Sequence, residues 1–146
     1  MSRNKQDPRR LLDHFGWHEW LCHTNFSFLV GASHPKDYLL RALEHGYRGL
    51  ALTDFDGAYG LARAHLDLKR LASSPRQTLK LAHGAELHLA EDHDLPLVHQ
   101  DTLALVATSK RGYGNLCRLL TYAHRHGKTG AFVPLADLCE IGRAHV

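Results

Sequence analysis

Three side chains with metal-ligating groups accompany apolar segments of the sequence. His23 lies in EWLCHT, Asp54 ends YRGLALTD, and Glu86 lies within LKLAHGAELHLA. If these segments are buried parallel strands, the three side chains meet at one rim of a sheet, where functional residues of such sheets collect. Imidazole and carboxylate groups gathered at one rim are suited to a divalent metal. One hypothesis is therefore a metal or carboxylate site.

Each of these side chains also has an ordinary structural interpretation. A single His at the end of an apolar strand is more often a hydrogen-bonded core residue than a ligand. Asp54 can accept hydrogen bonds from backbone N–H groups in the DFDG turn, where Asp56 can serve the turn itself. Glu86 can pair with a nearby arginine. Spacing alone slightly favours these structural roles.

Length and charge set broad limits on the molecule. The chain has 146 residues, 44% of them hydrophobic, which suffices for one core and predicts one domain. Its net charge is +3, and Lys and Arg are scattered along the sequence apart from the opening MSRNKQDPRR. No concentrated basic stretch indicates nucleic acid, so charge leaves the partners open.

Cysteine use and hydropathy indicate the compartment. The three cysteines lie far apart without a CxxC pair, which argues against a disulfide framework and a thiolate zinc site. No apolar run approaches the roughly 18 residues that span a bilayer, and the N-terminus lacks a signal-like apolar region. We therefore expect a soluble, cytoplasmic protein without membrane contact.

Strand patterns alternate with helix patterns along the chain. Ser33 is the expected N-cap of a helix that has Pro35 in its first turn and ends before Gly46. Leu61, Ala64, Leu68 and Leu71 recur at helical spacing, and a further helix is expected to end at Gly127. The predicted strands cover 19–24, 47–54, 79–90 and 102–108, with an acidic turn at 91–96. This order predicts an α/β fold with a mainly parallel sheet.

Several motifs resemble a known family. LCHTNFSFLVGASHP, GLALTDFDGAYGLARAH, LKLAHGAEL and GYGNLCRLLTYAHRHGKTG are similar to the N-terminal PHP domain of bacterial DNA polymerase III alpha subunits. Within this family, the sequence is most similar to the error-prone DNA polymerase branch, because it contains the short motifs NFSFL, GASHP, RAH and GYGNLC. The resemblance covers roughly residues 17–138. It implies a partial PHP-type (β/α) barrel of about four βα units.

The resemblance also locates the metal ligands of the family on this sequence. His23, Asp54 and Glu86 match ligand positions of metal-binding PHP domains. At the remaining positions the family places His or acidic residues, and Leu, Val and Phe have no lone pair for a divalent ion. The resemblance therefore implies a vestigial metal site and no catalytic residue on this segment. The lost ligand positions are Leu21, Val30, Phe55 and Thr102.

Other histidines leave a relocated metal site open. The chain has 13 histidines, and four of them surround Glu86 in the sequence. In a strand, Glu86 and His88 share one face because they are two residues apart. Clustered histidines more often belong to solvated surface, so this is the less favoured alternative. The four are His83, His88, His93 and His99.

The implied function is that of a noncatalytic N-terminal segment of an error-prone DNA polymerase, active in DNA replication and repair. Its partners would be the rest of the polymerase chain and, through the intact enzyme, DNA. No cofactor is expected here, because Mg²⁺ would be held by carboxylates of a downstream palm domain. One alternative is a metal-dependent phosphoesterase or 3′–5′ exonuclease using Zn²⁺ or Mn²⁺. Another is a free-standing interaction module.

The expected organisation has three parts. Residues 1–16 form a polar leader, residues 17–139 form the partial PHP domain, and residues 140–146 are a tail foreign to the natural polymerase. About four βα units leave a sheet with an unpaired edge, whereas a closed barrel has none. We therefore expect a truncated product that is poorly soluble or associates through this edge.

Overall fold

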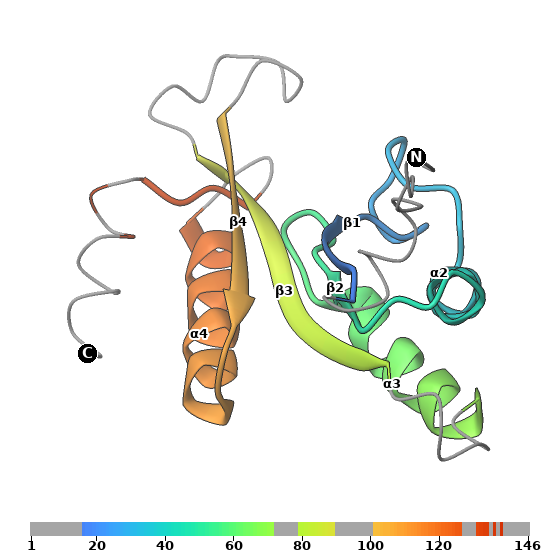
Figure 1. Ribbon diagram of the computed structural model, residues 1–146. Helices are drawn as coiled ribbons and strands as arrows, with labels where there is room; N and C mark the ends of the chain where they lie inside the picture. The colour runs from blue at the N-terminus through green and yellow to red at the C-terminus, as the bar shows by residue number, and fades with distance from the viewer. Residues whose placement is uncertain are drawn as a thin grey trace, which may run out of the picture.

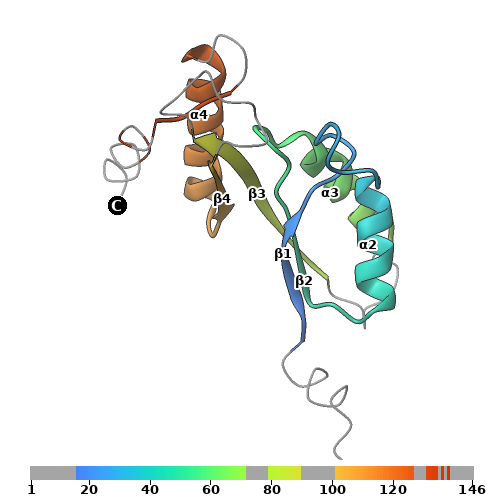
Figure 2. The ribbon, with the colours of Figure 1, turned by 90° about the horizontal axis from the view of Figure 1, so that it is seen from above.

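A computed structural model (Figure 1, Figure 2) describes residues 16–71, 79–89, 101–126, 131–134, 136 and 138. Within this part of the chain, four strands form one sheet and three helices cover it. The strands are β1 (His18–Cys22), β2 (Gly49–Leu52), β3 (Lys80–Leu89) and β4 (Asp101–Ala107). The helices are α2 (Pro35–Glu44), α3 (Tyr59–Leu71) and α4 (Lys110–His126).

The sheet is mainly parallel, and the predicted α/β class is confirmed. Its strand order is β1-β2-β3-β4, with β1 parallel to β2 and β2 parallel to β3. Helix α2 connects β1 to β2, and α3 precedes β3, so the first three strands form two βαβ units. The fourth strand differs from a βα repeat, because β4 runs antiparallel to β3.

Strand β3 accounts for the curl of the sheet. Its first four residues, Lys80–His83, pair with β2, and the stretch His83–Leu89 pairs with β4. The ten-residue strand thus changes partner along its length, and it bends visibly between β2 and β4 in Figure 1.

The hydrophobic core lies between the sheet and the helices. Leu50 and Leu52 of β2 pair with Leu81 and His83, and Ala85 and Leu87 continue along the same face of β3. The buried side chains form two adjacent clusters. One contains Cys22, Leu39, Ala42, Leu50, Leu52, Leu61, Ala64 and Leu79, and the other contains Ala85, Leu87, Leu116, Leu119, Leu120, Ala123, Ala131 and Val133.

Two helices begin at residues other than those expected. His34, rather than Ser33, is the N-cap of α2, because Pro35 occupies the first helical position. The backbone N–H of His34 donates to the Asp37 carboxylate at 3.1 Å. The stretch GYGNLCRLLTYAHRHG predicts a helix that starts at Gly112, but α4 begins two residues earlier. The Ser109 hydroxyl accepts the Gly112 N–H at 3.0 Å and caps the first turn.

Several expectations fall outside the described residues. They concern the leader up to residue 15, the acidic turn at 91–96, the end of the last helix at Gly127, and the tail at 140–146. Within the part of the chain that the structure describes, no helix has the length and apolar character needed to cross a membrane.

Candidate functional site

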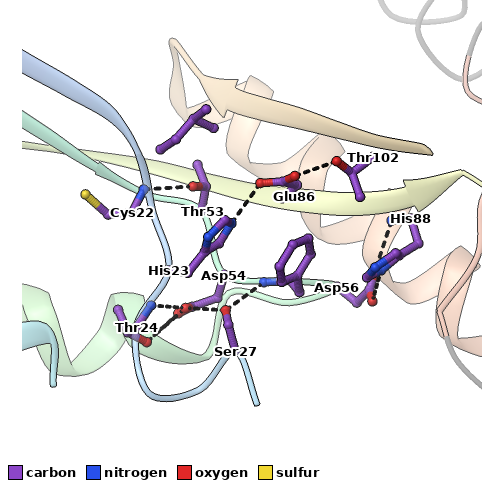
Figure 3. A network of polar contacts seen from close by, with 12 residues as sticks. Cys22, His23, Thr24, Ser27, Thr53, Asp54, Asp56, Glu86, His88 and Thr102 are labelled. Carbon is purple, nitrogen blue, oxygen red and sulfur yellow. Dashed lines mark hydrogen bonds and ion pairs between the residues drawn. The ribbon is translucent and has the colours of Figure 1, made fainter. Parts of the chain in front are cut away.

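The structure brings His23 and Glu86 into direct contact beside the sheet (Figure 3). His23 follows β1, and Glu86 lies on β3; Nε2 of His23 is 2.7 Å from Oε2 of Glu86. The Thr102 hydroxyl on β4 donates to the other carboxylate oxygen at 2.5 Å. Glu86 is therefore held by a histidine and a threonine rather than by the arginine that its sequence context left open.

Asp54 points away from this pair. Its side chain follows β2 and is directed toward the loop after β1, as Figure 3 shows. The residue is only 2% exposed. Burial of a carboxylate is costly unless its oxygens accept hydrogen bonds, so its donors decide its role.

The Asp54 carboxylate accepts hydrogen bonds from three residues. Oδ1 receives the backbone N–H of Thr24 at 2.6 Å and the Ser27 hydroxyl at 2.8 Å. The Thr24 hydroxyl lies 2.8 Å from Oδ2, which also receives the Gly60 N–H at 3.3 Å. The sequence predicted backbone donors, but it placed them in the DFDG turn; they come from the loop after β1 and from the start of α3. The carboxylate thus links its own segment after β2 to the loop after β1 and to the start of α3.

Phe55 fills the space between two histidines. Its ring stacks on His23, with centroids 4.5 Å apart and planes 11° from parallel, and on His88, at 4.9 Å and 27°. The resemblance places a metal-ligating His at this position. An aromatic hydrocarbon ring between two imidazoles cannot coordinate a cation.

A second histidine–carboxylate pair lies on the other side of Phe55. Asp56 Oδ2 is 2.7 Å from Nδ1 of His88, and Asp56 Oδ1 accepts the His88 backbone N–H at 3.1 Å. Asp56 adopts a left-handed φ of 52°, which Asp tolerates better than most residues. Asp56 is thus both a turn residue, as the sequence suggested, and the partner of His88.

The other replaced positions lie around this arrangement. Leu21 on β1 is 55% exposed, and Val30 in the loop after β1 is 59% exposed. The Thr102 hydroxyl donates its hydrogen bond to Glu86. Of the four replaced positions, only Thr102 supplies a polar side chain, and its oxygen is already engaged.

Glu86 and His88, the two residues of the relocated-site hypothesis, do not share a partner among the described residues. Both residues lie on β3, but each binds a different partner, His23 and Asp56 respectively. The ring centroids of His83 and Tyr113 lie 5.2 Å apart. His93 and His99 lie outside the described residues. Within the described ranges, no three His, Cys, Asp or Glu side chains converge closely enough to hold a metal ion.

The thiol next to His23 is held in its protonated form. Cys22 is 5% exposed, and burial raises its pKa to about 12, with smaller contributions from the charges of Glu19 and Asp54. A thiolate, not a thiol, is the metal ligand and nucleophile. Cys22 is therefore a core residue.

Sequence reasoning missed the residues that organise the site around Asp54. Thr24 and Ser27 belong to the motif HTNFSF, where their spacing of three is compatible with a tight loop. The Ser27 hydroxyl also accepts the Phe55 N–H at 3.0 Å, so the same loop positions the aromatic ring. The two hydroxyl residues of this motif were the available signal in the sequence, but only the folded chain shows that they bind Asp54.

Comparison with known proteins identifies the family. Residues 20–140 match the PHP domain family. The error-prone DNA polymerase of Anaeromyxobacter dehalogenans (strain 2CP-C) is 46% identical over 114 residues, which are 77% of this chain and 9% of that polymerase. That of Aromatoleum aromaticum is 42% identical over 118 residues, 80% of this chain and 10% of the relative. The chain thus spans about a tenth of the length of these relatives.

A solved structure shares the fold. An amidohydrolase from Chromobacterium violaceum with bound sulfate and no metal superposes with a TM-score of 0.53 and 21% identity, covering 74% of this chain and 33% of that protein. This likeness agrees with the curled, mainly parallel sheet. The resemblance seen in the motifs is confirmed by the family match and by these polymerase relatives, and the chain belongs to the PHP domain family.

Proposed function

We propose that this chain is the N-terminal PHP segment of an error-prone DNA polymerase and that its role there is structural rather than catalytic. The observation that carries the structural role is Phe55, whose ring occupies the space between His23 and His88. The polymerase assignment is supported by relatives of that name at 38–46% identity.

The donor set does not fit the metal centre of the family. His23 and Glu86 are bonded to each other, and Asp54 is directed into its own hydrogen-bond network. A cation placed at this rim would have to break the His23–Glu86 contact, and the described residues would then offer it only these two ligands. Two donors do not make the closed or nearly closed coordination sphere of a protein zinc site. No metal-dependent step is derived for this segment.

The two histidine–carboxylate pairs take over the structural task of a metal. One pair joins the end of β1 to β3, and the other joins the turn after β2 to β3. With Phe55 between them, the rim of three strands is closed by side chains alone. These contacts would keep the segment folded as a structural domain of the polymerase. DNA synthesis, with Mg²⁺ held by carboxylates of a palm domain, belongs to other parts of the intact enzyme.

The alternative is a metal-dependent phosphoesterase or 3′–5′ exonuclease with Zn²⁺ or Mn²⁺ on His23 and Glu86. The two hypotheses differ in what holds the rim together. A metal site loses its stability contribution when a chelator is added, whereas hydrogen bonds and stacking do not. Metal content and thermal stability therefore separate them.

The experiment measures metal content and melting temperature on the same preparation. The protein is incubated with Zn²⁺ or Mn²⁺, dialysed, and analysed by inductively coupled plasma mass spectrometry. Less than 0.1 metal ion per chain is expected, about a tenth of stoichiometric occupancy. The melting temperature should be the same with and without EDTA, and His23→Ala should lower it. His45→Ala, an exposed change at the end of α2, is the matched control.

One tightly bound ion per chain that disappears in His23→Ala, together with a melting temperature lowered by EDTA, would replace the structural role with the phosphoesterase. The polymerase assignment is tested separately by sequencing the source locus downstream of codon 146. A reading frame that continues into a palm domain supports it, and a stop codon directly after Val146 contradicts it.

A further inference from the structure

The outer face of α4 carries a line of three arginines. Arg111, Arg118 and Arg125 follow one another at intervals of seven residues, which is close to two helical turns. They therefore lie almost above one another, about 10.5 Å apart along the axis. All three are exposed, and the core side of the helix is formed by Leu116, Leu119, Leu120 and Ala123. We call these three residues the arginine line.

The cations of α4 are not neutralised by its neighbours. In α2, Arg41 pairs with Glu44, and in α3, Arg63 pairs with Asp67. Helix α4 contains no acidic residue, and within the described part of the chain no ion pair involves its Lys or Arg residues.

The position of the cations opposes the stability of the helix. Lys110 and Arg111 occupy the first turn of α4, where the macrodipole favours acidic side chains. Cations at the start of a helix that make no compensating contact inside the fold are expected at functional positions.

Helix α4 is one of two basic segments of the chain, the other being the opening MSRNKQDPRR. The four Lys and Arg residues of α4 exceed the net charge of +3, so the remainder of the sequence is slightly acidic. The cations of α4 look scattered in the linear sequence, but three of them share one face of the helix.

Two residues of the arginine line also border a hollow on the surface of α4. This shallow hollow has a volume of about 310 Å³ and is lined by Cys117, Arg118, Thr121, Tyr122 and Arg125. Guanidinium groups bind phosphate oxygens in a bidentate geometry and suit a polyanion with regularly spaced charges.

The face is also rigidly attached to the fold. Nε2 of His124, near the end of α4, lies 2.7 Å from the carbonyl oxygen of Asp56, and the opposite side of the helix packs on β3 and β4. Figure 1 shows α4 lying along β4 and β3 at the end of the sheet remote from α2. The arginines are therefore presented on a fixed support, which lowers the entropic cost of binding.

We propose that the outer face of α4 binds the phosphate backbone of a nucleic-acid strand through Arg111, Arg118 and Arg125. The line spans about 21 Å, which matches roughly six nucleotides at 3.4 Å per nucleotide. Contacts to phosphates alone do not distinguish base sequences. The proposal rests on the charge and geometry of α4 and holds whether or not the rim at His23 binds metal.

Fluorescence anisotropy of the 146-residue chain with labelled 20-nucleotide DNA tests it, in single-stranded and duplex arms at 50–200 mM NaCl. The triple variant R111Q/R118Q/R125Q should bind at least tenfold more weakly at the lowest salt. Because this variant neutralises three fewer phosphates, the slope of log K against log salt should become shallower by about 2 for single strands and about 2.7 for duplex.

A second triple variant, K36Q/K69Q/K80Q, removes the same net charge from α2, α3 and β3. Its binding should stay within about threefold of the unmodified chain, because it keeps the arginine line. A charge-preserving triple variant with lysines at the three arginine positions should retain most of the affinity. Circular dichroism verifies that all variants are folded.

Three results would overturn the proposal. The first is equal weakening by the two charge-removing triple variants, which would reduce the effect to net charge. The second is absence of DNA binding by the unmodified chain at 100 µM protein and 50 mM NaCl. The third is tighter binding of a deca-glutamate peptide than of a DNA strand with the same number of charges, which would assign the face to an acidic protein.

Discussion

The imidazole of His23 lies almost parallel to the ring of Phe55, with the two centroids 4.5 Å apart. The same imidazole is bonded to Glu86 through Nε2 at 2.7 Å. The ring nitrogen Nε2 of His23 thus has a carboxylate partner, and one face of the imidazole stacks on an aromatic ring. His23 therefore has partners that need no cation, at a position where metal-binding members of the family are expected to hold a ligand.

Asp54→Asn should destabilise the chain strongly. Its carboxylate accepts hydrogen bonds from Thr24, Ser27 and Gly60, and an amide nitrogen cannot accept. We expect a loss of about 2–3 kcal/mol in the free energy of unfolding, since buried donors left without an acceptor cost about 1–3 kcal/mol. Urea denaturation measures it, with the exposed Asp101→Asn as control. A change below about 0.5 kcal/mol, the size of a neutral surface substitution, would contradict this role.

Gly60→Ala should destabilise α3 although Ala is the better helix former. A Cβ at residue 60 would lie 2.7 Å from Oδ2 of Asp54 and 3.0 Å from the Thr24 hydroxyl oxygen. We expect a loss of about 1–3 kcal/mol from this overpacking. Gly114→Ala is the matched control, because nothing lies within 4 Å of its Cβ position in α4. That variant should gain up to about 1 kcal/mol; equal effects of the two substitutions would refute the close approach to Asp54.

Restoring two lost ligands should not restore hydrolysis. The double variant Leu21→His, Phe55→His returns imidazoles to positions where the family places them, but Val30 and Thr102 remain non-ligating and Asp54 remains in its hydrogen-bond network. Partial Zn²⁺ binding is the expected result. Hydrolysis of bis(p-nitrophenyl) phosphate is measured with and without metal. Steady turnover that requires metal would show that the segment holds a complete site.

Acidification should destabilise the chain through His83. Burial lowers its pKa below 6.5, and the nearby His65 lowers it further. Between the lowered pKa of the folded state and 6.5, the unfolded chain binds a proton at this position while the folded chain does not. The stability present above pH 6.5 is therefore lost as the pH falls through the folded-state pKa.

Urea unfolding between pH 7.5 and 5 of the unmodified chain and of His83→Gln tests this sign. The variant should lose less stability on acidification than the unmodified chain. His45→Gln, on the exposed end of α2, serves as the comparison. A profile of His83→Gln that runs parallel to that of the unmodified chain would exclude a contribution from His83.

Local patterns in the sequence were enough to predict most of the secondary structure. The apolar stripe Leu61, Ala64, Leu68 and Leu71 corresponds to α3, and the buried run before Asp54 contains β2. These patterns predict well because helix and strand periodicity depends on residues within one or two turns. The motifs predicted the family for the same reason, because each motif consists of contiguous residues.

Only the tertiary structure decided the partners of the polar side chains. Asp54 meets Thr24 across 30 residues, and His23 meets Glu86 across 63. Such contacts depend on strand register and on the curl of β3, which changes partner near His83. The antiparallel direction of β4 likewise follows from its pairing and not from its own pattern of residues.

The same distinction holds for the arginines of α4. Their spacing of seven residues is present in the sequence, where they look scattered between apolar and polar neighbours. A helix turns that spacing into one line, and the packing of Leu116, Leu119 and Ala123 against the sheet directs that line outward. The sequence alone determined which residues carry charge and which elements form. Tertiary packing decided which groups meet, because a side chain's partners are set by the positions of elements far apart along the chain.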